Sequence, residues 1–162
     1  IKEKTGVDSV VAGIYNYQVC FNQQLVQQKN LEEDKLRLWA ADYLLKDSAV
    51  SQAFDIRLTM LRPMNETQRK MIANGYNQQR SGEVQIILKP GYIDAGSTGT
   101  THGVWNPYDA HIPLLWYGWG IKHGATNKET YMTDIAATVA ALLHIQMPSG
   151  CVGHVIEDVM KR

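Results

Sequence analysis

Short apolar runs rich in β-branched and aromatic residues alternate along this chain with segments whose apolar residues recur at helical intervals. The strand-like runs span residues 10–21, 50–61, 83–91 and 112–118. The helix-like segments span residues 31–46, 65–76 and 133–144. Strands that alternate with helices in this way predict the α/β class, with a mixed and partly parallel sheet.

Capping and turn residues refine these expectations. Asn30, Asn65 and Thr133 precede the three helical segments as candidate N-caps. The run 10–21 is expected to turn after residue 21 and to continue into a short partner strand at residues 25–26. The run 112–118 is apolar on both faces, which is typical of a strand covered by helices on both sides.

The length and the charge of the chain exclude several classes. Its 162 residues favour one domain, and neither an internal repeat nor a linker interrupts them. Sixteen basic residues balance sixteen acidic ones, so electrostatic capture of nucleic acid or of an anionic membrane is not expected. No apolar stretch is long enough to span a bilayer, and the first residues lack the apolar core of a signal peptide. The missing initial methionine suggests processing or a piece of a longer protein.

The two cysteines do not form a metal motif. Cys20 and Cys151 lie far apart, without the spacing of a structural zinc site. Small buried apolar residues are the expected role for both, and a disulfide between them stays open because it depends on the compartment.

The segment GSTGTTHG, residues 96–103, holds the leading candidate for a functional residue. It follows the strand at 83–91, and loops after strands of an α/β sheet are where functional groups gather. Its glycines allow sharp turns that can aim His102 at a ligand. The segment lacks the lysine and the spacing of a phosphate-binding P-loop. His102 is therefore a metal ligand or a catalyst, or else it only forms hydrogen bonds within the loop.

The residues near His102 also have structural explanations. Asp109, two residues from His111, could ligate a metal or orient an imidazole, but the NPYD sequence also predicts a turn in which Asp109 bonds local backbone. A structural role is favoured for both residues. Thr100 and Thr101 could act as nucleophiles, but neither a lysine nor a second metal-binding cluster stands beside them to activate a hydroxyl.

The remaining histidines and tryptophans favour structural roles. His123, His144 and His154 have no acidic or histidine neighbours at metal-ligand spacing. Trp116 and Trp119 could stack against a ligand, but in so apolar a run they favour the core or an interface.

Three linked motifs carry a family resemblance. GTTHG, YDAHIPL and TDIAATVAALL together resemble the C-terminal signature of the alkaline phosphatase superfamily. The nearest branch includes the periplasmic phosphate-irrepressible phosphatases and the nucleotide pyrophosphatase and phosphodiesterase group. The resemblance is good over residues 70–155 and looser before them. It implies that residues 1–162 form a single C-terminal part of an alkaline-phosphatase-like α/β/α sandwich.

The resemblance also implies a mechanism and its limits. Proteins of this family hydrolyse phosphate esters with two zinc ions, and the histidine of GTxHG, here His102, is a zinc ligand. Their nucleophile and other ligands lie upstream of the region represented here, so the chain alone is expected to be inactive. The implied partners are a phosphate-ester substrate and the N-terminal half, in a periplasmic or secreted protein. A phosphomonoesterase is favoured; a phosphodiesterase segment and a non-catalytic module that self-associates through an exposed strand edge, as a homodimer, are the alternatives.

Overall fold

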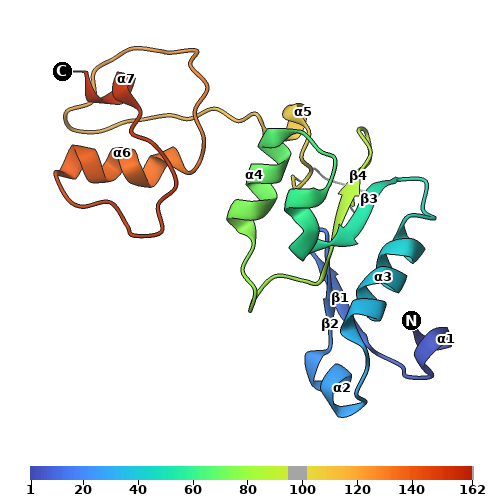
Figure 1. Cartoon of the computed structure of the whole chain (residues 1–162). Helices are drawn as coiled ribbons and strands as arrows, with labels where there is room; N and C mark the ends of the chain where they lie inside the picture. The colour runs from blue at the N-terminus through green and yellow to red at the C-terminus, as the bar shows by residue number, and fades with distance from the viewer. Residues whose placement is uncertain (95–101, 162) are drawn as a thin grey trace. The chain divides into compact units, whose positions relative to one another are not determined.

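A computed structural model describes residues 1–94 and 102–161 (Figure 1). Its elements are α1 (Lys2–Thr5), β1 (Val11–Tyr15), β2 (Gln18–Phe21), α2 (Gln23–Gln28), α3 (Glu33–Leu44), β3 (Val50–Asp55), the 3-10 helix η1 (Ile56–Leu61), α4 (Glu66–Gly75), β4 (Val84–Leu88), α5 (Pro107–Ala110), α6 (Asp134–Leu143) and α7 (Glu157–Met160). The chain divides into two compact units, Ile1–Ile112 and Pro113–Arg162. Within the described residues, no helix is long and apolar enough to cross a membrane.

The first unit is built on a four-stranded sheet in the order β1-β2-β4-β3. Its α/β character confirms the predicted class, but the expected partly parallel pairing is wrong, since the three pairs among the described strands are antiparallel. β2 and β3, which α2 and α3 connect, do run in the same direction. β4 lies between them and runs antiparallel to both, so the helical connection does not create a parallel pair.

Helices cover both faces of this sheet (Figure 1). On one face, α3 packs Leu36 against Ala53 and Ile86 in the larger core cluster. On the other face, α4 packs Ile72 against Phe54 and Ile87. Because successive side chains of a strand point to opposite faces, the central strand β4 is buried on both, which explains why it is apolar apart from Gln85.

Local signals located the helices better than the strands. The segments 31–46, 65–76 and 133–144 contain α3, α4 and α6. The Asn65 side chain accepts a hydrogen bond from the Gln68 N–H at 2.8 Å, so this residue caps α4 as predicted. Thr133 occupies the predicted N-cap position of α6, although its side chain forms no capping hydrogen bond. The prediction for Asn30 is wrong, because Glu32 occupies the N-cap of α3.

The strand predicted at residues 10–21 is two strands rather than one. Residues 10–21 form two strands, because Asn16 and Tyr17 both have positive φ, 50° and 58°, and turn the chain within the run. Paired positive φ values are typical of two-residue hairpin turns. The partner strand expected at residues 25–26 is also wrong: these residues belong to α2, which the Asn22 side chain caps by accepting the Leu25 N–H.

The second predicted strand, at residues 50–61, is shorter than expected. It ends at Asp55, and the 3-10 helix η1 follows it.

The second unit does not contain the buried strand expected at 112–118. Residues 112–118 form no strand, and the side chains of Leu115 and Tyr117 are largely exposed. Pro113 offers no N–H, and no described strand offers its backbone to this segment, so an apolar run alone does not become a strand here. Trp119, expected in a core or an interface, is 97% exposed and is not part of the core of this chain.

Polar contacts organise the second unit around α6. The Asp134 carboxylate accepts hydrogen bonds from the Tyr131 and His154 N–H groups, both at 2.9 Å. The Thr138 hydroxyl donates to the Asp134 carbonyl and accepts the Ile156 N–H. The segment around residue 153 is therefore tied to α6 mainly through backbone groups.

Candidate functional site

α5 places an acidic side chain next to the candidate histidine. Asn106 precedes Pro107, whose ring fixes φ at the first turn of this short helix. Two residues on, the helix presents Asp109, whose side chain is only 10% exposed although that of His102 is 80% exposed. The turn predicted from NPYD is thus the start of a helical turn that carries the carboxylate.

Asp109 and His102 form a close pair. The His102 Nδ1 atom lies 2.6 Å from the Asp109 Oδ1 atom. The other carboxylate oxygen, Oδ2, accepts the N–H groups of Gly103 and Val104, each at 2.8 Å. One carboxylate therefore fixes both the imidazole ring and the backbone directly after it.

The electrostatics of this pair determine which ring nitrogen carries the proton. The N–H groups of Gly103 and Val104, and then His102, lower the pKa of Asp109. The carboxylate is therefore ionised at neutral pH and only accepts hydrogen bonds, so the Nδ1 of His102 is the donor. A neutral ring with its proton on Nδ1 has its lone pair on Nε2, which is the form that binds a metal when a carboxylate orients the ring.

Two of the three roles predicted for Asp109 occur together. It bonds local backbone, and it orients an imidazole, but that of His102 rather than of its sequence neighbour His111. His111 ends α5, is exposed, and donates its backbone N–H to the Pro107 carbonyl. Thr100 and Thr101 lie outside the described residues.

Two tyrosines near this pair were missed by the sequence reasoning. The Tyr108 hydroxyl accepts the Gly91 N–H and the Asn106 side-chain N–H, both at 2.9 Å. Tyr17 lies in the hairpin turn between β1 and β2, and its hydroxyl accepts the Asp94 N–H at 3.0 Å. No spacing rule links a hairpin turn to a loop more than seventy residues later, so only the fold could reveal the second contact.

The other candidates are not brought to this site. His123, His144 and His154 belong to the second unit and are exposed. Cys20 and Cys151 are half-buried free thiols, and burial, followed by the charge of Glu83, raises the pKa of Cys20. Among residues 1–94 and 102–161, no group of three or more histidine, cysteine or acidic side chains could hold a metal ion. Of the predicted candidate residues that the structure describes, His102 and Asp109 are the two that it brings together.

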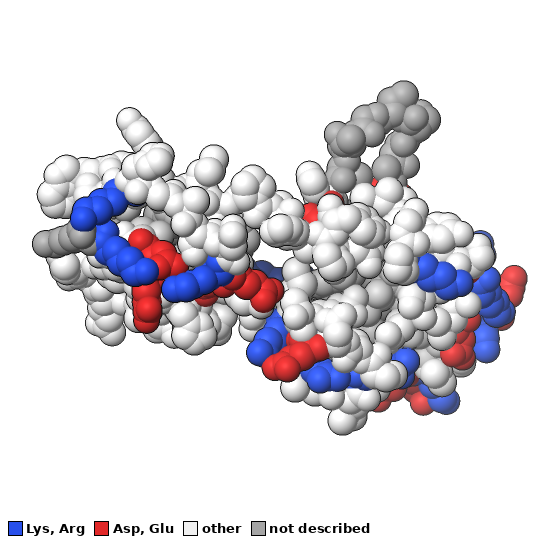
Figure 2. Space-filling view, turned by 90° about the horizontal axis from the view of Figure 1, so that it is seen from above, with Lys and Arg blue, Asp and Glu red and all other residues white. Residues whose placement is uncertain are grey.

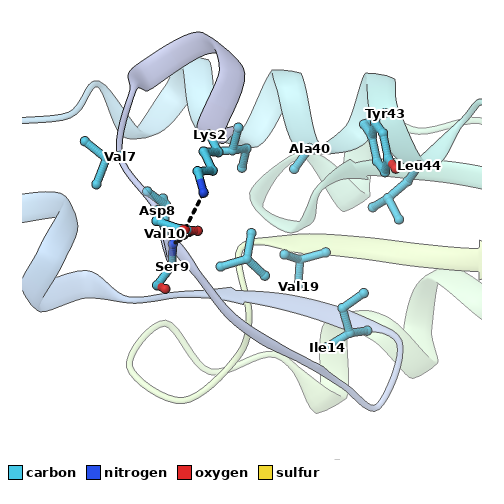
Figure 3. A pocket seen from close by; sticks show the side chains of 12 residues that line it. Lys2, Val7, Asp8, Ser9, Val10, Ile14, Val19, Ala40, Tyr43 and Leu44 are labelled. Atoms are coloured by element: carbon cyan, nitrogen blue, oxygen red, sulfur yellow. Dashed lines mark hydrogen bonds and ion pairs between the residues drawn. The ribbon is translucent and has the colours of Figure 1, made fainter.

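A separate hollow of about 530 Å³ lies between the β1–β2 hairpin and α3 (Figure 3). Val10, Val19 and Leu44 line its apolar wall. Its charged side chains, Lys2 and Asp8, pair with each other at 2.5 Å in exposed positions. Because no other titratable side chain except Tyr43 lines it, this hollow has no convergent group for catalysis.

The surface charge has no single-sign region on the face shown in Figure 2. Lysine and arginine side chains alternate there with aspartate and glutamate, in agreement with the balanced composition. This distribution offers no extended positive surface for a polyanion on that face.

Three curated proteins match this chain, and two of them are named alkaline phosphatases. The chain is 45% identical over 163 residues to alkaline phosphatase PafA of Elizabethkingia meningoseptica, covering 100% of this chain and 30% of the relative. It is 43% identical over 170 residues to alkaline phosphatase PhoV of Synechococcus elongatus, covering 99% of this chain and 31% of the relative. A calcium-transporting ATPase of Myroides odoratus is 38% identical over 164 residues, with 100% and 30% covered.

The structural comparison gives the same result. The crystal structure of wild-type alkaline phosphatase PafA matches with a TM-score of 0.90 at 43% identity, covering 99% of this chain and 31% of that one. A crystal structure of a PafA mutant matches equally well, at 44% identity. No known family model matches the chain. The chain spans about three tenths of the length of the curated relatives that it matches.

Proposed function

This chain is a C-terminal part of an alkaline phosphatase superfamily protein, and from this premise we propose that the whole protein is a zinc-dependent phosphomonoester hydrolase to which the chain contributes His102 as a metal ligand. The observation that carries the proposal is the His102–Asp109 pair, with its 2.6 Å contact. The phosphatase names of two relatives support a phosphatase over a phosphodiesterase, and the ATPase name of the third also concerns phosphoryl chemistry.

The residues present fit a zinc site to which they contribute only part of the coordination. Imidazole nitrogen is a preferred zinc ligand, and an outer carboxylate that holds the second nitrogen is a recurring arrangement around such ligands. Asp109 keeps the proton of His102 on Nδ1 and fixes the ring plane. When bound, a pair of zinc ions would stabilise the attacking and leaving oxygens of a phosphoryl transfer. The nucleophile and the remaining ligands are expected in the part of the protein outside residues 1–162.

The proposed function also implies a cellular location, a substrate and a partner. We expect a periplasmic or secreted protein, as the alkaline phosphatase relatives suggest. The substrate would be a phosphate monoester, and the N-terminal part of the same protein would be the partner that completes the site.

Replacement of the candidate ligand tests this proposal in the full-length parent protein. His102→Ala is expected to weaken zinc binding more than about 100-fold, because even outer-shell partners contribute about 10–100-fold to metal affinity. Hydrolysis of an aryl phosphate should fall with it. His123→Ala, which removes an exposed histidine of the second unit, is the matched control and should change neither quantity. Zinc affinity is measured by competition with a chromophoric chelator.

A non-catalytic module that self-associates is the second candidate. β1 lies at one edge of the sheet and exposes Ile14 and Tyr15, so its backbone is open to pairing with another copy. The same preparations separate the two candidates. Unchanged zinc affinity and an unchanged hydrolysis rate in His102→Ala would contradict the metal role and favour this alternative.

A further inference from the structure

The hairpin turn between β1 and β2 has an unusual residue for its conformation. Tyr17 has a φ of 58°, in the left-handed region that a bulky side chain rarely adopts. Turns of this geometry favour glycine at the second position, because glycine has no Cβ to clash. A tyrosine there points to a side-chain role that compensates for the strained backbone.

The Tyr17 side chain contacts the chain on both sides of the segment that leads to His102. Its hydroxyl accepts the Asp94 N–H at 3.0 Å. Its ring lies against Gly103, where an added Cβ would be 3.4 Å from the ring carbon Cε2. Gly103 directly follows His102, and its N–H is one of those that Asp109 binds.

The backbone of Tyr17 is fixed to the centre of the sheet. Its carbonyl accepts the Ile86 N–H at 2.8 Å and the Gln85 side-chain N–H at 3.1 Å. Gln85 lies in the central strand β4 and is fully buried. The ring of Tyr17 also packs against the larger core cluster. This residue therefore connects the most buried strand of the unit to the loop of the exposed histidine.

We propose that Tyr17 is a positioning residue for the metal ligand His102: it fixes Asp94 and Gly103 to the sheet, so that the imidazole is held where a zinc ion can bind. The inference rests on the proposed function, because it assigns the loop a metal to hold. Asp109 fixes the orientation of the imidazole ring and the nitrogen that carries its proton, whereas Tyr17 fixes the positions of Asp94 and Gly103 relative to β4. The two residues therefore restrain different movements of His102.

The test removes one hydroxyl from the full-length parent protein. Tyr17→Phe keeps the ring against Gly103 but loses the hydrogen bond to Asp94. It is expected to weaken zinc binding by up to about tenfold, at the lower end of the effect of outer-shell partners. Tyr15→Phe removes the hydroxyl of an exposed tyrosine in the same hairpin and is the matched control. Zinc affinity is measured by chelator competition, and the metal geometry by the visible absorption of the cobalt-substituted protein.

Each outcome decides one proposal. A cobalt spectrum that changes in Tyr17→Phe but not in Tyr15→Phe, at an unchanged melting temperature, supports the positioning role. Equal affinities and spectra in the two variants overturn it, and so does a lower melting temperature with an unaltered spectrum, which would assign Tyr17 to stability alone. His102→Ala, measured in parallel, separates the two levels: if that variant also binds zinc normally, the proposed function itself fails.

Discussion

The two units of this chain differ in how they use their apolar residues. Residues 1–112 bury large side chains on both faces of a sheet, with Leu36 and Phe54 in the two clusters. Among the described residues 113–161, the buried apolar side chains are Ala137, Ala140 and Ile156. The first unit therefore completes a hydrophobic core within the chain, while the second depends on hydrogen bonds to backbone groups. The candidate site lies in the unit that has the core.

This difference bears on the proposal that His102 is a metal ligand. An exposed histidine is ordered only if the groups that contact it are themselves fixed, and packing supplies that rigidity more effectively than exposed hydrogen bonds do. His102 gains it through Asp109, which is mostly buried, and through the hairpin turn on the sheet. The histidines of the second unit are exposed and have no comparable support in the described structure.

The largest effect is expected from opening the core of the first unit. Leu36 is 1% exposed, and Leu36→Ala should lower the free energy of unfolding by about 3 kcal/mol, through lost transfer energy and a residual cavity. Leu38→Ala, on the exposed side of the same helix, should change it by less than about 0.5 kcal/mol. Urea denaturation measures the change, and amide hydrogen exchange should locate the loss of protection in residues 1–112. Equal effects of the two variants would contradict the assigned core.

A smaller loss of stability is expected from a substitution that disturbs the second unit and leaves the first unit unchanged. A Cβ added at Gly153 would lie 2.0 Å from the Thr133 carbonyl oxygen and 2.7 Å from the Asp134 nitrogen. Because these are backbone atoms, the segment must move, and Gly153→Ala should destabilise the unit by about 2 kcal/mol, as overpacking typically does.

Gly150→Ala is the control for this prediction, since an added Cβ there meets nothing within 4 Å. Hydrogen exchange at His154 and Ile156, whose N–H groups bind Asp134 and Thr138, should accelerate only in the Gly153 variant. Unaltered exchange at both positions would show that the segment is not held as described.

The sequence predicted those features of the fold that neighbouring residues determine. The cap of α4 depends on Asn65 and on an N–H three residues away, so it was predicted correctly. The turn at Asn16 and Tyr17 was missed, because a tyrosine with positive φ is stabilised by contacts with Gln85 and Asp94, far along the chain. The strand at 112–118 was wrong, because a strand also needs a neighbouring backbone.

The candidate site was likewise predicted only in part. The GTTHG motif singled out His102, and the family resemblance supplied its expected role. The contact between Asp109 and His102 was not predicted: the sequence suggested only His111 as an imidazole partner and favoured a structural role for both Asp109 and His111. Side-chain pairs across a loop depend on its path, which spacing does not encode.

The smallest effect is expected at the most exposed tryptophan of the second unit. Trp119 is 97% exposed, so Trp119→Ser in this chain should change the free energy of unfolding by less than about 0.5 kcal/mol. In the full-length parent protein the same substitution tests whether the second unit gains apolar packing from the rest of the protein. If the rest of the protein completes the apolar packing that the second unit lacks, the variant should there lower the melting temperature, because a buried tryptophan contributes a large apolar area. An equally small change in both settings would mean that this apolar surface stays exposed in the whole protein, and that the second unit is stabilised by its polar contacts alone.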